Sequence, residues 1–357
     1  IYVLKYIDRD NLKYLYFSLG TYFIALLSKE MAITLIAVIP FTLFFFRNLE
    51  LKRVFQTTIW FILVAIFYFI LRNSILDTLA FDEKMTVINN ALAAAPNFSS
   101  QISTTFYIFG DYLKLLVLPI NLSWDYSYPH FSIVSFNNFQ VIIVLLFSIL
   151  VTVLSVLAIS KKSFYAYSWL FFISTFSIVS NFFILIGATL GERFLFFPSI
   201  ALSIALFAVG KQLAIKMNPK YFQLALLLFI VFYSVKTVSR NKDWKNNHSL
   251  FEAGAIATPN NTRAISALAT VYREKGEQTN NINLKREYFG KAVIFYKKSI
   301  ELYKENTDSW YNLGVTYMNQ GNDQAAKTTF ATLLQFNPSN LNALNNLGVI
   351  NFREQNY

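Results

Sequence analysis

The stretch DSWYNLGVTYMNQGNDQAAKTTFATLLQFNP, residues 308–338, has the pattern of two short helices that pack against each other. Small residues stand where two helices can approach closely, aromatic residues stand where a gap between helices is filled, and a proline ends the second helix. The pattern is carried by Trp310, Leu313, Gly314, Tyr317, Gly321, Ala326, Phe330 and Pro338. These residue types at this spacing predict a helical pair whose inner faces form a small core.

The same pattern recurs on both sides of this stretch, with the 34-residue period of a tetratricopeptide repeat. The next repeat begins with Leu344, Leu347 and Gly348, and an earlier one contains Leu268, Ala269, Tyr272, Gly276, Ala292 and Tyr296. Stacked repeats form a solenoid with a concave surface that binds other proteins. We therefore predict an α-helical repeat domain over residues 239–357. Because the chain starts on Ile1 and stops inside a repeat, we expect a piece of a longer protein.

The rest of the chain has the composition of an integral membrane protein. Of its 357 residues, 55% are hydrophobic and only 14% are charged, where soluble domains are about a quarter charged. The absence of cysteine excludes disulfides and thiolate catalysis, and two isolated histidines give no spacing for a metal site. The net charge of +11 lies largely in short loops beside apolar stretches, so it indicates membrane topology and predicts no nucleic-acid partner.

Seven apolar stretches are candidates for membrane-spanning helices, which need about 20 residues each. They cover residues 14–27, 31–46, 54–71, 139–159, 164–186, 194–209 and 221–238. An eighth stretch, residues 102–120, is ambiguous because it contains Asp111 and Lys114. The overall prediction is an all-α fold in which a polytopic membrane domain, residues 1–238, precedes the repeat solenoid.

Basic loops resolve the ambiguous stretch, because loops rich in lysine and arginine face the cytoplasm. Such loops lie near residues 47–53, at residues 161–162 and within residues 211–220. All three share one side only if residues 102–120 form an amphipathic helix in the interface instead of a span. Residues 72–138, the loop around Glu192 and the whole repeat domain then face the exoplasmic side.

Charged residues gather on that predicted outer face, and they are the candidate functional residues. Charges at the edge of a membrane cost about 2.5 kcal/mol or more when isolated, so they suggest a role in binding. Arginine suits phosphate, because its planar guanidinium donates paired hydrogen bonds and stays charged. The candidates are Lys29, Glu30, Arg72, Asp125, Glu192 and Arg193.

Each candidate also has a plainer interpretation. Lys29 and Glu30 could form a solvated turn, and Arg72 could anchor the end of an apolar helix at the interface. Glu192 and Arg193 could form a local ion pair at the start of a helix, where an acidic residue is favourable. Asp125 could cap a turn in the aromatic loop NLSWDYSYPH, residues 121–130.

Several phrases in this order resemble the transmembrane and tetratricopeptide-repeat protein O-mannosyltransferases and their bacterial relatives. The phrases are LLSKEMAITL, FILRNSIL, YLKLLVLPINLSWDYSYPH, GERFLFFPSIAL and RNKDWKNNHSLFEAGAIATPNN. The resemblance implies a membrane glycosyltransferase of the GT-C class. Such an enzyme moves a sugar, here expected to be mannose, from a polyprenyl-phosphate donor to serine or threonine of a protein on the exoplasmic side. It implies no protein-bound cofactor and leaves metal dependence open.

The resemblance also implies roles for the candidate residues. Arg193, Arg72 and Lys29 would bind the lipid phosphate, Glu192 and Glu30 would orient these cations, and Asp125 would shape the acceptor or sugar pocket. The catalytic acidic residue is expected upstream of residue 1. The Phe- and Asn-rich composition favours a bacterial inner membrane with periplasmic repeats. Two alternatives stay open: a non-enzymatic membrane-anchored repeat scaffold, and a transporter or ligase for lipid-linked glycans.

Overall fold

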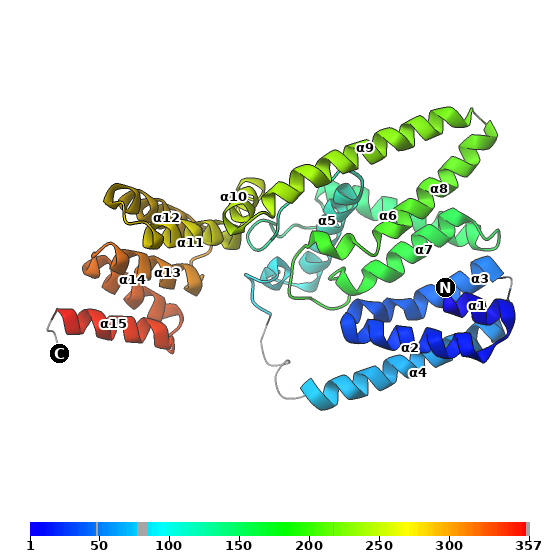
Figure 1. The fold of residues 1–357 in the computed structure, drawn as a ribbon, viewed down its shortest axis with the longest axis horizontal. Coiled ribbons are helices and arrows are strands. Elements are labelled where there is room, and N and C mark those ends of the chain that lie inside the picture. Colours follow the sequence, from blue (N-terminus) through cyan, green and yellow to red (C-terminus); the bar gives the residue numbers. More distant parts are fainter. Residues whose placement is uncertain (48, 77–84, 217, 355–357) are drawn as a thin grey trace.

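The chain is helical throughout its described part and consists of a bundle of long helices followed by a stack of shorter ones (Figure 1). The computed structural model describes residues 1–47, 49–76, 85–216 and 218–354. These residues contain no β-strand. The all-α prediction, with apolar helices first and repeats second, is therefore confirmed.

The N-terminal bundle contains the apolar helices. Its α-helices are α1 Tyr2–Arg9, α2 Leu12–Ser28, α3 Leu35–Arg47, α4 Leu51–Leu76, α5 Phe98–Val117, α6 Phe139–Ile159, α7 Phe164–Phe176, α8 Ser199–Lys216 and α9 Pro219–Asp243. Four short 3-10 helices connect them: η1 Glu30–Thr34, η2 Ala91–Ala94, η3 Ser177–Val179 and η4 Glu192–Leu195.

Each of the seven predicted spans overlaps an apolar helix, but the structure does not confirm a count of seven spans. In the described residues, four helical stretches are long and apolar enough to cross a membrane: Glu30–Arg47, Leu51–Ile75, Phe139–Ile159 and Lys220–Asp243. Three further apolar helices are shorter: Leu12–Ser28, Phe164–Val179 and Ser199–Leu213.

The predicted span over residues 164–186 is too long, because the helix ends at Val179. Just beyond this end, Asn181 adopts a left-handed conformation with φ of 60°. Its side chain accepts a hydrogen bond from the Ile186 backbone N–H (2.9 Å) and donates to the carbonyls of Ala188 and Thr189. The side-chain amide of Asn90 donates to the side-chain Oδ1 of Asn181 at 2.9 Å. This buried amide network turns residues 180–191 into a loop although the sequence stays apolar.

The predicted span over residues 194–209 begins too early. The chain forms the 3-10 helix η4 at Glu192–Leu195, and α8 starts only at Ser199, directly after Pro198. Proline fixes φ and lacks a backbone donor, so it suits the position where a new helix begins. Glu192 therefore opens a short 3-10 turn and not the long apolar helix.

The ambiguous stretch 102–120 lies mostly within α5. This helix packs with its Ser103, Thr104, Ile108 and Tyr112 side chains buried, while Lys114 is exposed and paired with Asp111 at 2.8 Å. The charged pair on one side of a buried helix agrees with an amphipathic segment; its place in the membrane interface stays a prediction. Residues 77–84 of the predicted exoplasmic segment lie outside the described residues.

The basic segments share one end of the bundle. Figure 1 shows that the C-terminal end of α3, the turn between α6 and α7, and the C-terminal end of α8 all lie away from the repeat helices. This is the shared side that the positive charges predicted. Which face of a membrane it meets stays a prediction.

The C-terminal stack is built from the helices α10 Asn247–Ala257, α11 Thr262–Gln278, α12 Ile282–Leu302, α13 Thr307–Asn319, α14 Asp323–Phe336 and α15 Leu341–Arg353. Each of them begins at an asparagine whose side chain accepts a hydrogen bond from a backbone N–H in the first turn. The caps are Asn246, Asn261, Asn281, Asn306, Asn322 and Asn340. An asparagine cap stabilises a helix by about 1 kcal/mol, so the caps define all six starts.

The signature residues of the repeat occupy the places that their spacing predicted. Ala326 and Phe330 are fully buried between α13 and α14, and Leu313 is 3% exposed. Gly314 lets the Phe330 ring approach, because a Cβ at position 314 would lie only 2.5 Å from that ring. Trp310 and Tyr317 pack on the same cores, and Pro338 follows the end of α14.

Candidate functional site

Four of the predicted site residues converge where α2 meets the loop before η4. Lys29, Glu30 and Arg193 line one cavity of about 380 Å³. Arg72 joins them through an ion pair in which its Nη2 lies 2.9 Å from Oε1 of Glu30. Glu30 thus pairs with one of the candidate cations, the contact that the family resemblance implied, and the positive charge of Arg72 is held beside the cavity.

A second groove, of about 530 Å³, opens on the other side of Arg193. Its walls come from the C-terminal end of α5, from η4 and from the helices α8 and α9. Three cations line it, Arg193, Lys236 and Arg240, together with the single carboxylate Glu192. The groove therefore concentrates positive charge at one place between apolar helices.

Arg240 has two nitrogen atoms whose hydrogen-bond donors are unpaired among the described residues. One of its nitrogens, Nη1, lies 2.9 Å from Oδ2 of Asp243. Its Nε and Nη2 atoms are buried without a hydrogen-bond partner among the described residues. Buried donors without partners cost about 1–3 kcal/mol each, which an oxyanion in the groove would relieve. We call this groove the cation groove, after the three cations Arg193, Lys236 and Arg240 that line it.

Lys236 and Arg240 were not among the sequence candidates. They stand at positions i and i+4 near the end of α9, so one face of that helix carries both. The sequence signal is present in KTVSRNKDWK, residues 236–245, where the apolar run of α9 ends in closely spaced basic residues. Lys236 falls inside the predicted span 221–238 and Arg240 inside the predicted repeat domain, and nothing in the sequence brings α9 next to η4.

Glu192 faces away from its neighbour Arg193. Its Oε1 accepts hydrogen bonds from the backbone N–H of Ser123 (2.6 Å) and from the hydroxyl of Tyr126 (2.7 Å). None of the ion pairs among the described residues joins it to Arg193. Burial raises the pKa of the Glu192 carboxyl above its usual range, and the hydrogen bond from Tyr126 and the charge of Arg240 offset this only in part.

Arg193 instead stacks on its other neighbour. Its guanidinium carbon lies 4.9 Å from the centre of the Phe194 ring. A cation held over an aromatic face is oriented without losing its hydrogen-bond donors. Arg193 lines both the cavity beside Lys29 and the cation groove, so it is the residue that the two sites share.

Asp125 lies at the boundary between the bundle and the repeats. Its Oδ2 accepts from the Asn261 side chain at 3.1 Å, and its Oδ1 lies 3.5 Å from Nη1 of Arg263. It also accepts from the backbone N–H of Ser127, which is the turn-capping bond of the plainer interpretation. Asp125 lines neither the cation groove nor the cavity beside Lys29.

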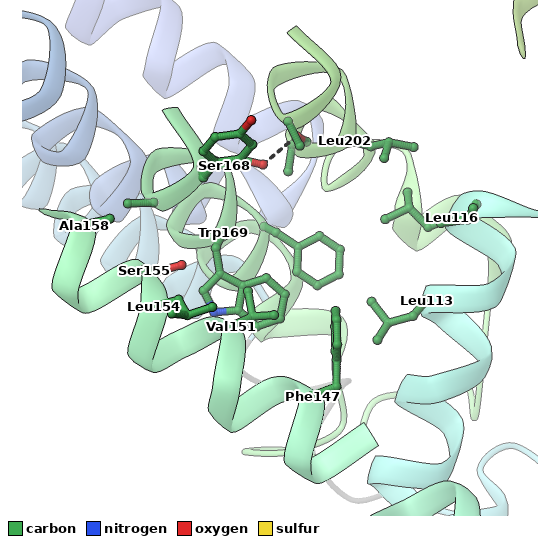
Figure 2. A pocket seen from close by; sticks show the side chains of 16 residues that line it. Leu113, Leu116, Phe147, Val151, Leu154, Ser155, Ala158, Ser168, Trp169 and Leu202 are labelled. Carbon is green, nitrogen blue, oxygen red and sulfur yellow. Dashed lines mark hydrogen bonds between the residues drawn. The ribbon is translucent and has the colours of Figure 1, made fainter. Parts of the chain in front are cut away.

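An apolar pocket of about 480 Å³ adjoins the cation groove (Figure 2). It lies between α5, α6, α7 and α8, and Figure 2 shows Leu113, Phe147, Val151 and Trp169 directed toward its interior. Leu116 lines both this pocket and the cation groove. A charged groove and an apolar pocket between helices are thus neighbours that share Leu116 in their walls.

Metal ligands do not gather anywhere in the described part of the chain. Within it, no three His, Cys, Asp or Glu side chains are close enough together to hold an ion.

Comparison with known proteins finds one repeat family and several relatives. The tetratricopeptide repeat family matches residues 295–328, which run from α12 through α13 into α14. The Mus musculus protein O-mannosyl-transferase TMTC1 is 24% identical over 237 residues, which are 63% of this chain and 24% of the mouse protein. Protein O-mannosyl-transferase F38B6.6 of Caenorhabditis elegans is 26% identical over 196 residues, 54% of this chain and 28% of the relative.

A third relative is more nearly identical to the chain but over a shorter stretch. Protein O-mannosyl-transferase tmtc2 of Xenopus laevis is 34% identical over 84 residues, which are 22% of this chain and 10% of the frog protein. The chain is thus similar to parts of several protein O-mannosyl-transferases. It spans about a quarter of the length of the first two relatives. The family resemblance of the sequence phrases is thereby confirmed, and a glycosyltransferase is the class of enzyme to which the relatives belong.

Proposed function

We propose that the chain belongs to a membrane glycosyltransferase that transfers a sugar, mannose in the first instance, from a polyprenyl phosphate to serine or threonine of a protein. The observation that carries the proposal is the cation groove with the apolar pocket beside it, the two sharing Leu116. A polyprenyl phosphate has the matching chemistry, because an anionic head is joined to a hydrocarbon chain.

The cation groove would serve the phosphate. In the transfer, the bond between the sugar carbon C1 and the phosphate oxygen breaks, and the phosphate leaves with the electron pair. A bond forms between C1 and the acceptor hydroxyl oxygen, which gives up its proton to a base. Cations placed where negative charge develops stabilise such a departing group. Arg193, Lys236 and Arg240 supply that charge, and we assign no base among the described residues.

The apolar pocket would take the first units of the lipid chain. Because Leu116 lines both sites, a chain leaving the cation groove would have to pass this side chain to enter the pocket. Lys29, Glu30 and Arg72 would hold a second, adjoining charged surface on the far side of Arg193 for the sugar or the leaving phosphate. The repeats would bind the protein acceptor through their concave surface.

The same proposal includes a setting. The repeats and the cation groove would lie on the exoplasmic side, opposite the basic turns. The composition favours a bacterial inner membrane, where undecaprenyl phosphate would be the carrier and the repeats would be periplasmic.

Binding of undecaprenyl phosphate by the purified chain in nanodiscs tests the proposal without requiring turnover. Charged hydrogen bonds contribute about 1.5–3 kcal/mol, so Arg193→Ala and Arg240→Ala should each weaken binding by about tenfold or more. Lys220→Ala is the matched control, because Lys220 lies on α9 at the opposite end from Arg240 and should leave Kd unchanged.

A scaffold that only anchors the repeats gives a different result. It would bind undecaprenyl phosphate no better than an uncharged polyprenol, and the three variants would behave alike. That outcome would remove the transferase proposal. A sugar-transfer assay with the donor and a serine- or threonine-containing peptide then separates a transferase from a transporter, which releases no glycosylated product.

A further inference from the structure

One loop of the bundle, residues 121–131, lies between η4 and the first repeat helices. We call it the docking loop. It follows α5 and contains Ser123, Trp124, Asp125, Tyr126 and Tyr128. Figure 1 shows the segment after α5 lying against α10, at the place where the bundle meets the stack.

On the bundle side, Glu192 holds the docking loop. Its Oε1 accepts from the Ser123 N–H at 2.6 Å and from the Tyr126 hydroxyl at 2.7 Å. The Tyr126 hydroxyl also accepts from the same Ser123 N–H at 3.0 Å. Tyr126 is 6% exposed and Ser123 is 2% exposed, so these bonds are shielded from water and make the loop conformation specific.

On the repeat side, the docking loop is bound by the start of α11. Asn261 donates its amide to the backbone carbonyl of Asp125 at 2.8 Å and to its Oδ2 at 3.1 Å. The other end of the same amide, Oδ1, caps α11 by accepting from the N–H groups of Arg263 and Ala264. One buried asparagine therefore starts the helix and binds the loop at once.

Further contacts surround this bond. Arg263 lies 3.5 Å from Oδ1 of Asp125 and donates through Nη2 to the side chain of Asn89, which belongs to the bundle. The N–H of Thr262 donates to the carbonyl of Tyr128 at 3.3 Å. The ring of Tyr128 packs edge-on against Tyr303.

Apolar packing between the docking loop and α10 adds to these hydrogen bonds. The Trp124 ring lies 5.1 Å from that of Phe251 on α10, centre to centre. It also covers Gly254, where an added Cβ would lie 2.5 Å from the indole. The hydroxyls of Ser123 and Thr258 lie 3.2 Å apart, which adds a hydrogen bond between the docking loop and the residue after α10. The covalent connection between bundle and repeats is the short segment between α9 and α10, residues 244–246.

We propose that Glu192 is a positioning residue that fixes the orientation of the repeat domain relative to η4. Among the described residues, its hydrogen bonds go to the docking loop, and it acts through that loop. Because Glu192 and Arg193 are neighbours on η4, the cation groove and the repeats then move as one body. Without the Glu192 bonds, the docking loop loses its anchor and the repeats turn about residues 244–246. On the proposed function, this would set where an acceptor held by the repeats meets the donor.

The chain has no cysteine, so spin labels can be attached at single chosen sites. We would measure the distance between labels at Ser99→Cys on α5 and Lys297→Cys on α12 by double electron–electron resonance in nanodiscs. The parent pair should give one narrow distance distribution. Glu192→Ala should broaden it, whereas Glu192→Gln, whose amide oxygen still accepts both hydrogen bonds, should restore it.

The controls separate orientation from folding. A second label pair inside the repeats, Lys297→Cys and Gln335→Cys, should stay narrow in every variant. Tyr126→Phe removes only a hydroxyl and should broaden the first pair with little risk to the fold. Glu287→Ala, an exposed acid on α12, should change neither pair.

A narrow first pair in both Glu192→Ala and Tyr126→Phe would overturn the proposal. A second outcome would also overturn it: Tyr126→Phe keeps the narrow distance distribution of the first pair, while Glu192→Ala broadens the distributions of both pairs. In that case Glu192→Ala has only lost its fold. The measurement needs no donor and no turnover, so it stands whether or not the proposed transferase function holds.

Discussion

At the residue scale, the neighbours Glu192 and Arg193 both line the cation groove but make different contacts. Arg193 lines the cation groove with its guanidinium over Phe194, and Glu192 points to the docking loop. In a 3-10 helix successive side chains leave the axis about a third of a turn apart, so two adjacent charges need not pair. The two charged residues at the start of η4 therefore contact different partners and do not form an ion pair with each other.

The buried carboxylate of Glu192 should make stability depend on pH. Burial raises its pKa in the folded chain above the unfolded value, so the folded state holds the proton more tightly. Stability contributed by Glu192 is then full below the unfolded pKa and decreases as the pH rises through the folded pKa. Relative to the parent, Glu192→Gln should gain Tm as the pH rises over that window, with no further gain above it. Thermal unfolding in detergent at a series of pH values measures this. A Tm difference that does not vary with pH would contradict it.

The candidate residues themselves were visible in the sequence, because charges beside apolar runs stand out. Lys29, Glu30 and Arg193 line one cavity, as their common predicted side suggested. Lys236 and Arg240 could not be chosen, since their role depends on α9 passing η4. The partners of Asp125 were equally hidden, because Asn261 and Arg263 lie more than 130 residues further along the chain.

At the element scale, the periodic parts of the chain were predictable and the irregular parts were not. The repeat helices follow small and aromatic residues at fixed spacing, so their packing could be predicted from the pattern alone. The loop over residues 180–191 is mostly apolar, and the hydrogen bonds of Asn181, including the one from Asn90, hold it in place. A long-range bond between two amides leaves no local pattern.

Two equivalent glycines in successive repeats should respond oppositely to alanine. At Gly314 the new methyl would meet the fully buried Phe330 ring, so Gly314→Ala should cost about 1–3 kcal/mol. At Gly348, on α15, nothing lies within 4 Å, so Gly348→Ala should stabilise the helix by about 0.5–1 kcal/mol. Chemical unfolding followed by circular dichroism gives both values. Equal effects at the two positions would show that Phe330 does not restrict Gly314.

At the scale of the whole molecule, charge and architecture divide the chain into two ends. The basic turns occupy the end of the bundle away from the repeats (Figure 1). The cation groove is lined by the C-terminal end of α9, which is followed at once by the first repeat helix α10. Positive turns normally stay in the cytoplasm, so the groove and the repeats should lie across the membrane from them.

Single cysteines can report this sidedness in intact cells. Lys297→Cys, on α12, should react with a membrane-impermeant maleimide added outside. Lys161→Cys, between α6 and α7, should react only after the membrane is permeabilised. Both positions are exposed, so accessibility within the protein does not limit either reaction. The reverse pattern of labelling would place the repeats in the cytoplasm and remove the exoplasmic reaction from the proposal.

The contact between Trp124 and Gly254 should make the bundle and the repeat domain evolve together at these two positions. Since the indole occupies the space a side chain would need at position 254, neither site can change size alone. Among homologues, a bulkier residue at 254 should therefore occur only with a smaller one at 124. A repeat array exchanged from another protein would arrive without that compensation. Successful recombination between such proteins should place its breakpoint after the first repeat helices, so that the loop and the helix it covers are inherited together.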